Sequence, residues 1–434
     1  MADARTEAVK LLGKTFSKGG YSNILLDKTL EKSALDEADK KLCAALYYGV
    51  LERKITLDYI ISCYCKQGIS RLNPEVQNIL RTGIYQIKYM DNIPDSAAVN
   101  ESVKIAKKLK LGRLSGLVNA VLRNFLRDGA EIRYPQKKYE KMSVEYSAPE
   151  WLTKLLLDNY PEEQAVSLLQ SSVNKPPVTI RLNNIKCPDR QKALDSLGIT
   201  AEETVLDGCY KIENGDVTKL ESFENGLFHV QDIASQLCCH SLSPDEGDTV
   251  LDVCAAPGGK TFTMAELMNN GGKIFAFDIH EHRVKLIRNG AKRLGITNIS
   301  AETGNAAVYN EKMPMADKIL CDVPCSGLGV IRRKPEIKYK NYEEFERLPE
   351  IQYRILETAA SYLKKGGELV YSTCTVNPAE NGQVIDRFLN EHRNFEGITF
   401  LEELGKPFVE YKVTLFPENF NSDGFFISKI KRTE

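Results

Sequence analysis

Two cysteines follow two short apolar runs in the second half of the chain. Cys325 stands in Asp322-Val-Pro-Cys-Ser, and Cys374 ends Tyr371-Ser-Thr-Cys. Neither belongs to a Cys-x-x-Cys pair or a His/Cys cluster, so neither zinc nor another metal is expected. Eleven Cys, an odd number scattered along the chain, favour reduced thiols. A special cysteine in this chain is therefore expected to be reactive, not structural.

A glycine-containing loop lies earlier, after the apolar run 249–254, and reads Ala255-Ala-Pro-Gly-Gly-Lys-Thr. Gly258 and Gly259 lack Cβ atoms, so the backbone can turn tightly and present helix-start amides to an electron-rich ligand. The Lys-Thr pair lacks the spacing of a phosphate-binding P-loop. Asp278 follows 20 residues after Gly258, an offset suited to ribose hydroxyls. We expect a nucleoside ligand; the carboxylate disfavours NADP and leaves NAD and S-adenosylmethionine.

Short apolar strands that alternate with longer helices must position these groups. The strand candidates are 249–254, 273–278, 318–323 and 368–372, and helices are predicted at 282–294 and 350–363. This alternation predicts a mostly parallel, doubly wound sheet, in which ligands lie at the carboxyl ends of the strands. Both thiols and the glycine loop fall at such ends. One shared site is therefore expected in the region from about residue 232 onward.

The first third of the chain differs in pattern and charge. Leu114, Leu117, Val118 and Val121 have helical spacing, and similar runs predict a helical bundle of about 135 residues. The net charge of −1 conceals 25 Lys and Arg against 17 Asp and Glu in the first 146 residues. Residues 104–141 hold 11 basic and 3 acidic side chains, a composition that attracts phosphate backbones. The alternative is a solvated helical face.

Length and composition limit the class of protein. A chain of 434 residues with 42% hydrophobic side chains suggests several globular domains. No apolar run approaches the roughly 18 residues of a membrane span, and the start is too charged for a signal peptide. We expect a soluble, cytoplasmic protein, with a monomer as the default.

Three motifs, in this order, resemble those of RNA (cytosine-5) methyltransferases of the RsmB/Sun, Nop2 and NSUN superfamily. They are Asp252-x-Cys-Ala-Ala-Pro-Gly-Gly-Lys-Thr, Asp322-x-Pro-Cys-Ser and Ser372-Thr-Cys. The segments 93–107 and 118–122 resemble the RNA-binding factor NusB, and a NusB-like region ahead of this catalytic region is similar to RsmB. The resemblance implies an all-α NusB-like bundle at 1–137, a small α+β middle module at 145–231 and a Rossmann-like class I methyltransferase domain, an α/β fold, at 232–432.

The resemblance also implies a chemistry for the site. Cys374 would be the nucleophile that adds to C6 of a cytosine, protonated Asp322 would bond N3, and Cys325 would assist loss of the C5 proton. The methyl donor would be S-adenosylmethionine. Asn305 stands where the family usually has Asp. The implied cofactor-binding residues are Cys254, Ala255, Ala256, Pro257, Gly258, Gly259, Lys260, Asp278, Asn305 and Asp322.

The expected function is 5-methylcytosine formation in 16S ribosomal RNA, with C967 as the family's target. The alternatives are a related enzyme for tRNA or another rRNA site, and a non-catalytic NusB-like RNA-binding or assembly factor. A path for the RNA is predicted along a basic and aromatic stretch after Cys325: Arg332, Arg333, Lys334, Lys338, Tyr339, Lys340 and Tyr342.

Overall fold

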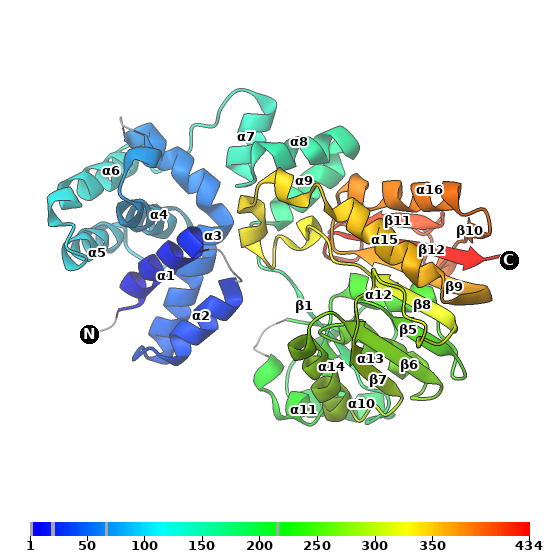
Figure 1. The fold of residues 1–434 in the computed structure, drawn as a ribbon. Coiled ribbons are helices and arrows are strands. Elements are labelled where there is room, and N and C mark those ends of the chain that lie inside the picture. Colours follow the sequence, from blue (N-terminus) through cyan, green and yellow to red (C-terminus); the bar gives the residue numbers. More distant parts are fainter. Residues whose placement is uncertain (1–2, 19–21, 66–67, 214–216) are drawn as a thin grey trace. The chain divides into compact units, whose positions relative to one another are not determined.

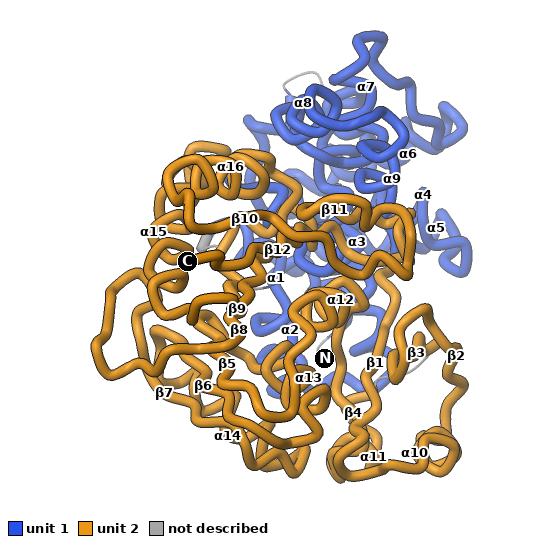
Figure 2. Tube along the Cα trace, turned by 90° about the vertical axis from the view of Figure 1, so that its right-hand side faces the viewer, with its two compact units in different colours: residues 1–174, 331–340 blue, residues 175–330, 341–434 orange. Residues whose placement is uncertain are grey.

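The chain divides into two compact units. The computed structural model describes residues 3–18, 22–65, 68–213 and 217–434 (Figure 1). Unit 1 comprises residues 1–174 and 331–340, and unit 2 comprises 175–330 and 341–434 (Figure 2). The expected middle module, 145–231, is split between them, because its residues up to 174 belong to unit 1 and the rest, which includes all of its strands, belongs to unit 2.

Unit 2 is built on a sheet with the strand order β10-β12-β9-β8-β5-β6-β7, with β11 paired to β12. The five strands from β9 to β7 in this order run parallel, and β12 pairs antiparallel with β9. The predicted doubly wound sheet is thereby confirmed. Its strands are β5 (Thr249–Asp252), β6 (Lys273–Asp278), β7 (Ile299–Thr303), β8 (Ala316–Asp322), β9 (Leu363–Thr373), β10 (Phe395–Gly397), β11 (Lys412–Leu415) and β12 (Phe425–Arg432).

Alternate residues of these strands pack into two separate cores. Val250, Leu320 and Val370 pack with α12, α13 and α14 on one face of the sheet. Leu251 and Cys321, their neighbours in sequence, pack with α15 and α16 on the other face. A strand buried on both faces reads as a continuous apolar run, which is why the sequence indicated these strands. The helices are α12 (Ile233–Leu242), α13 (Gly259–Leu267), α14 (Glu281–Leu294), α15 (Leu348–Ala360) and α16 (Gly382–Glu391).

A smaller antiparallel sheet of unit 2 has the order β2-β3-β1-β4. Arg181, on β1, donates from Nε to Glu266 of α13 at 2.9 Å, and both side chains are buried. Asn183 donates from Nδ2 to the carbonyl of Leu294 at the end of α14 (2.7 Å). These bonds attach the small sheet to the large one. Its elements are β1 (Val178–Leu182), α10 (Arg190–Leu197), β2 (Ala201–Glu203), β3 (Cys209–Ile212), α11 (Glu221–Glu224) and β4 (Phe228–Val230).

Unit 1 is helical, as predicted. Asn73 caps α4 by accepting from the amide of Glu75 (2.8 Å), and Pro74 occupies the first turn. α6 buries Val118 and Val121 and ends just before Gly129, whose φ is +77°. The helices are α1 (Ala4–Lys18), α2 (Ser22–Glu31), α3 (Glu37–Tyr64), α4 (Pro74–Tyr89), α5 (Asp95–Lys108), α6 (Ser115–Arg127), α7 (Lys138–Glu145), α8 (Glu150–Asn159) and α9 (Glu162–Ser171).

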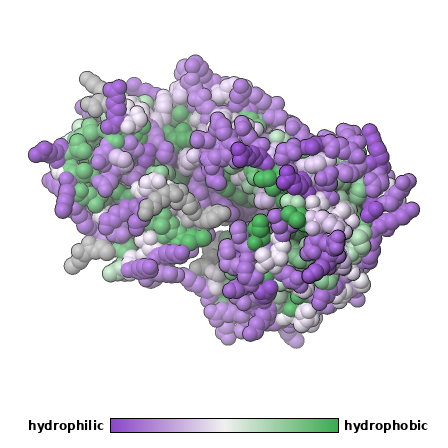
Figure 3. Space-filling model, in the orientation of Figure 1, coloured by the Kyte–Doolittle hydropathy of each residue, from purple (hydrophilic) through white to green (hydrophobic). Residues whose placement is uncertain are grey.

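The surface visible in Figure 3 is mostly hydrophilic, with scattered hydrophobic side chains. Across the described ranges, no helix combines the length and the apolar character that crossing a membrane requires.

The long helix α3 is kinked at Arg53 (φ −114°, ψ 17°). On the amide side of the kink, Ile55 N donates to Ser147 Oγ (3.0 Å) instead of to a backbone carbonyl of the preceding helical turn. On the carbonyl side, Lys338 Nζ donates to Glu52 O (2.7 Å), and the Tyr339 hydroxyl donates to Leu51 O. Both donors belong to the inserted segment 331–340. This segment therefore satisfies backbone groups that a straight helix would satisfy internally.

Burial changes the titration of Lys338, whose side chain is fully buried. Loss of solvent lowers its pKa from 10.5 to about 7, against the opposing effect of Glu52. Between these two pH values the unfolded chain holds a proton that the folded chain lacks. The contribution of Lys338 to the free energy of unfolding therefore rises with pH from about 7 toward 10.

We expect Lys338→Met to lower the free energy of unfolding by about 1–3 kcal/mol, because the carbonyl of Glu52 loses its hydrogen-bond donor. The difference from the unsubstituted chain should grow as pH rises from about 7 to 10. Urea unfolding followed by the fluorescence of Trp151, the single tryptophan, reports on unit 1 because Trp151 lies on α8. Lys340→Met, at an exposed neighbouring position, is the control and should show no such pH slope. Parallel pH curves for Lys338→Met and the unsubstituted chain would contradict the assignment.

Candidate active site

The two cysteines meet because β8 and β9 are adjacent and parallel. Asp322 is paired with Ser372, and Val323 N donates to Ser372 O (3.1 Å) where the pairing ends. The chain then carries Cys325 and Cys374 to an Sγ–Sγ distance of 3.3 Å, and both residues are partly exposed. The structure therefore brings together two thiols that stand 49 residues apart in the sequence.

The two thiols differ electrostatically. The hydrogen bond with Cys374 raises the pKa of the Cys325 thiol well above its usual value, and burial and the charges of Cys374 and Glu380 act in the same direction. The contact between the two thiols therefore favours the protonated form of Cys325.

Two glycines support the turn behind Cys374. Gly329 N donates to Cys374 O (3.0 Å), and Gly424 N donates to Gly329 O (2.9 Å). A Cβ at Gly329 would lie 1.8 Å from the carbonyl oxygen of Gly424. Only glycine fits there, because no side chain can occupy that space. A Cβ at Gly424 would in turn lie 2.7 Å from Gly329 Cα, which explains the Gly in Asp423-Gly-Phe-Phe.

Asp322 occupies the centre of the site. Its Oδ2 accepts from Lys260 Nζ (2.8 Å), and its Oδ1 accepts from Ser372 Oγ (2.9 Å). Burial alone would lower the pKa of Lys260, but the Asp322 carboxylate outweighs it and raises that pKa above its usual value. Both carboxylate oxygens of Asp322 thus accept hydrogen bonds, one of them from an ammonium group.

The glycine loop turns sharply at Gly258, which has a φ of +112°. A Cβ there would meet the Phe262 ring at 2.4 Å. Just before the loop, Asp252 Oδ2 accepts from Thr261 Oγ1 (2.7 Å), while Asp252 Oδ1 is buried without a hydrogen-bond partner. Burial raises the pKa of Asp252 to about 7. Such an orphaned carboxylate oxygen fits the amino group or positive charge of a ligand.

Asp278 ends β6 and is buried beside the same loop. Its Oδ1 accepts from His280 N (3.0 Å), and its Oδ2 pairs with Arg283 Nη1 (3.1 Å). Arg283 also donates to Ala256 O (2.8 Å), which joins the acidic residue to the glycine loop. Asn305 is exposed, lines an open pocket and accepts from Ala307 N through Oδ1 (3.1 Å).

Four residues that contact the site were given no role from the sequence alone: Asp252, Ser372, Arg283 and Glu380. Asp252 and Ser372 lie inside the quoted motifs, so the motifs themselves were the signal. Arg283 and Glu380 carried no such signal, because their contacts with the site depend on the folded chain.

The basic residues of 104–141 are all exposed. Three of them, Lys104, Lys137 and Lys138, form ion pairs with glutamates. Lys107, Lys110 and Arg113, around the end of α5, have no ion-pair partner among the described residues. They are therefore available to phosphates.

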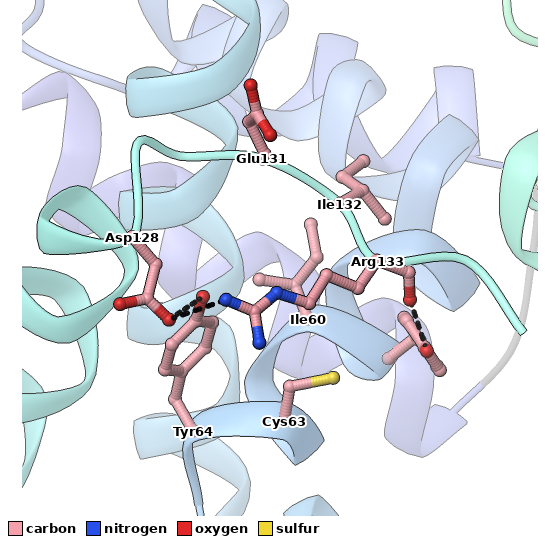
Figure 4. Close-up of a pocket in the computed structure, with 8 residues that line it drawn as sticks. Ile60, Cys63, Tyr64, Asp128, Glu131, Ile132 and Arg133 are labelled. Atoms are coloured by element: carbon pink, nitrogen blue, oxygen red, sulfur yellow. Dashed lines mark hydrogen bonds and ion pairs between the residues drawn. The ribbon is translucent and has the colours of Figure 1, made fainter.

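A small pocket lies beside α3 in unit 1 (Figure 4). Tyr59 OH donates to Arg133 O (2.6 Å), and Tyr64 OH donates to Asp128 Oδ2 (3.1 Å), which also lies 3.8 Å from the Arg133 guanidinium. These groups bind one another and fasten the segment after α6 to α3. The polar groups that line the pocket therefore hold the structure of unit 1 together.

The predicted RNA path is wrong for Lys338 and Tyr339. Lys338 is fully buried, and both side chains donate to carbonyls at the kink of α3. Their place directly after the Cys325 motif suggested a substrate contact. The charge and the aromatic ring serve the packing of unit 1 instead.

The parallel sheet, the glycine turn after β5 and the acidic residue ending β6 form a doubly wound fold for a nucleoside-containing cofactor, as in a class I methyltransferase. Family models agree along the chain: 16S rRNA methyltransferase RsmB/F matches residues 239–431, the NusB family matches 2–127, and an RsmF/B-like ferredoxin-like domain matches 148–214. The chain belongs to the RsmB/F methyltransferase family, which confirms the resemblance and the predicted fold class.

Curated relatives match over nearly the full length. A probable ribosomal RNA small subunit methyltransferase B of Bacillus subtilis is 39% identical over 99% of this chain and 98% of its own. One of Synechocystis is 34% identical over 100% of both chains. Among solved structures, a methyltransferase homologue from Pyrococcus horikoshii is 28% identical, with a TM-score of 0.58 over 69% of this chain and 100% of its own.

S-adenosylmethionine is the methyl donor in this family, and the residues present fit it. The orphaned Asp252 Oδ1 suits its amino group, the Gly258 turn leaves room for it, and Asp278 suits its ribose hydroxyls. When bound, the cofactor supplies an electrophilic methyl group at the edge where Cys374 and Asp322 lie.

Gly258→Ala should weaken S-adenosylmethionine binding by about tenfold or more, because a Cβ strains the turn at positive φ and meets Phe262. Isothermal titration calorimetry measures the affinity. Gly247→Ala is the control, since a Cβ at Gly247 would meet nothing within 4 Å. Equal affinities for the two variants would remove the glycine turn from the cofactor site.

Proposed function

We propose that the protein methylates C5 of a cytosine in 16S ribosomal RNA through a covalent bond between Cys374 and C6. The observation that carries the proposal is the pair of thiols 3.3 Å apart at the ends of β8 and β9, with Asp322 beside them. The printed names of the relatives, small subunit methyltransferases, support ribosomal RNA as the substrate. Within that RNA, C967 is the target we propose.

The first step makes C5 of cytosine, which is a weak nucleophile, reactive enough to accept a methyl group. The Cys374 thiolate bonds to C6, and the electron pair of the C5–C6 double bond is displaced toward C5 and the N3 side of the ring. Asp322 delivers a proton to N3 from Lys260, whose Nζ is 2.8 Å from Asp322 Oδ2. The enriched C5 then takes the methyl group.

The second step releases the enzyme. Loss of the C5 proton returns its electron pair to the ring, restores the C5–C6 double bond and expels the Cys374 sulfur. Cys325 assists this step: after its thiol proton passes to solvent, its sulfur, 3.3 Å from that of Cys374, takes the C5 proton, and the proton on N3 returns to Asp322. Two thiols thus divide attack and release between them.

The RNA must present an unstacked cytosine, because a base inside a helix cannot reach a thiol. The basic residues of 104–141 supply sequence-independent attraction for the phosphates around it. Bisulfite sequencing of small-subunit ribosomal RNA from a strain lacking the gene tests the target. Loss of 5-methylcytosine at C967 alone is the expected result, and an unchanged methylation pattern would refute the substrate.

Cys374→Ala should abolish both methylation and the covalent protein–RNA complex, whereas Cys325→Ala should accumulate that complex because release fails. Denaturing gel electrophoresis with labelled RNA separates the complex from free RNA. Cys187→Ala, a cysteine of unit 2 outside the site, is the matched control and should behave like the unsubstituted enzyme. A complex that forms with Cys374→Ala but not with Cys325→Ala would reverse the two roles.

Replacing Lys107, Lys110 and Arg113 together with Ala should weaken RNA binding and lower the slope of log affinity against log salt by up to about 3, roughly one per lost phosphate contact. Binding titrations at several salt concentrations measure this slope. Lys10→Ala with Lys40→Ala is the control, because both lysines pair with glutamates on their own helices. An unaltered slope in the triple variant would assign these residues to a merely solvated face.

A further inference from the structure

Glu380 is a fully buried carboxylate in unit 2 that the mechanism above does not use. It ends the short 3₁₀ helix η7 (Pro378–Glu380), six residues after Cys374. Its side chain reaches the loop after β8, which carries Cys325. Each of its two oxygens accepts two hydrogen bonds.

Glu380 Oε2 accepts from the backbone amide of Ser326 (2.8 Å) and from Gln352 Nε2 (2.9 Å). Glu380 Oε1 accepts from Ser326 Oγ (2.5 Å) and from Asn377 Nδ2 (3.0 Å). A buried carboxylate with its four acceptor positions filled is held in one orientation.

Gln352, on α15, is also fully buried and completes the arrangement. The same Nε2 that bonds Glu380 donates to the carbonyl of Pro324 (3.0 Å). The residues immediately before and after Cys325 are therefore both held, Pro324 by Gln352 and Ser326 by Glu380. The peptide that carries the thiol has little freedom left.

The arrangement also joins the two cysteine loops. Ser326 Oγ lies 2.7 Å from Thr375 Oγ1, and these residues directly follow Cys325 and Cys374. The backbone carbonyl of Glu380 accepts from the Tyr371 hydroxyl (2.6 Å), which fixes η7 against β9. The distance between the thiols thus depends on side chains from three elements.

We propose that Glu380, acting with Gln352, is a positioning residue that sets Cys325 against Cys374 and so controls release of the methylated RNA. The inference rests on the proposed function, because it assumes that Cys325 serves release. The negative charge of Glu380 also lies near Cys325, where it favours the protonated thiol before the substrate binds.

Glu380→Gln is the sharpest test because it keeps the shape of the side chain. Whichever way the new amide turns, its NH₂ faces a nitrogen donor, either Ser326 N and Gln352 Nε2 or Asn377 Nδ2. We expect multiple-turnover methylation to fall by about 10- to 100-fold while the covalent RNA complex accumulates. Affinity for S-adenosylmethionine should stay unchanged.

Gln352→Met is the second variant, since it removes the donor to Pro324 but leaves the carboxylate of Glu380 in place. It should show the same accumulation in weaker form. Glu396→Gln is the matched control, because it makes the same chemical change at an exposed position on β10, and it should leave turnover and complex formation unchanged. Equal losses of complex formation and turnover in folded Glu380→Gln, or no change in either, would overturn the proposal.

A measurement without RNA separates this inference from the proposed function. The rate of alkylation of Cys325 by iodoacetamide, followed by mass spectrometry, should rise at lower pH in Glu380→Gln than in the unsubstituted chain, because the nearby negative charge is gone. An identical pH profile would overturn the role of Glu380 whatever the RNA substrate is. Failure of the Cys374→Ala prediction, with the pH shift present, would instead refute the proposed function. If Glu380→Gln does not fold, the accumulation of complex by Gln352→Met decides.

Discussion

The site depends on the register between β8 and β9. Asp322 lies beside Ser372 because backbone hydrogen bonds pair the two strands residue by residue. Cys321 and Tyr371, one position earlier, point into a buried core, so a slip of one residue would turn an apolar side chain into the site and a carboxylate into the core. The packing of the sheet on both faces therefore sets the distance between the reactive groups.

Polar groups close to the site are buried or partly buried, and most are paired with one another. Lys260 neutralises Asp322, and Arg283 neutralises Asp278. Asp252 retains an unsatisfied oxygen, which costs stability in the absence of a ligand. Asp252 therefore has an acceptor oxygen left for a ligand, whereas Asp322 and Asp278 are already paired.

The sequence predicted the large sheet, the helical first third and the edge where the motifs meet, because strands buried on both faces and amphipathic helices leave strong patterns. It did not predict that Gln352 and Glu380 bracket Cys325, since neither side chain stands in a periodic pattern and their contact needs α15 and η7 folded. For Lys338 the sequence misled, because a lysine beside a reactive cysteine suggests a substrate contact. Its burial at the α3 kink follows only from tertiary structure.

The inserted segment 331–340 makes the chain pass from one unit to the other three times, at 174–175, 330–331 and 340–341. A fragment cut at residue 174 would lose the donors that the Leu51 and Glu52 carbonyls use. A NusB-like part taken out of this chain would therefore keep the partners of these two carbonyls only if the ten residues 331–340 were taken with it.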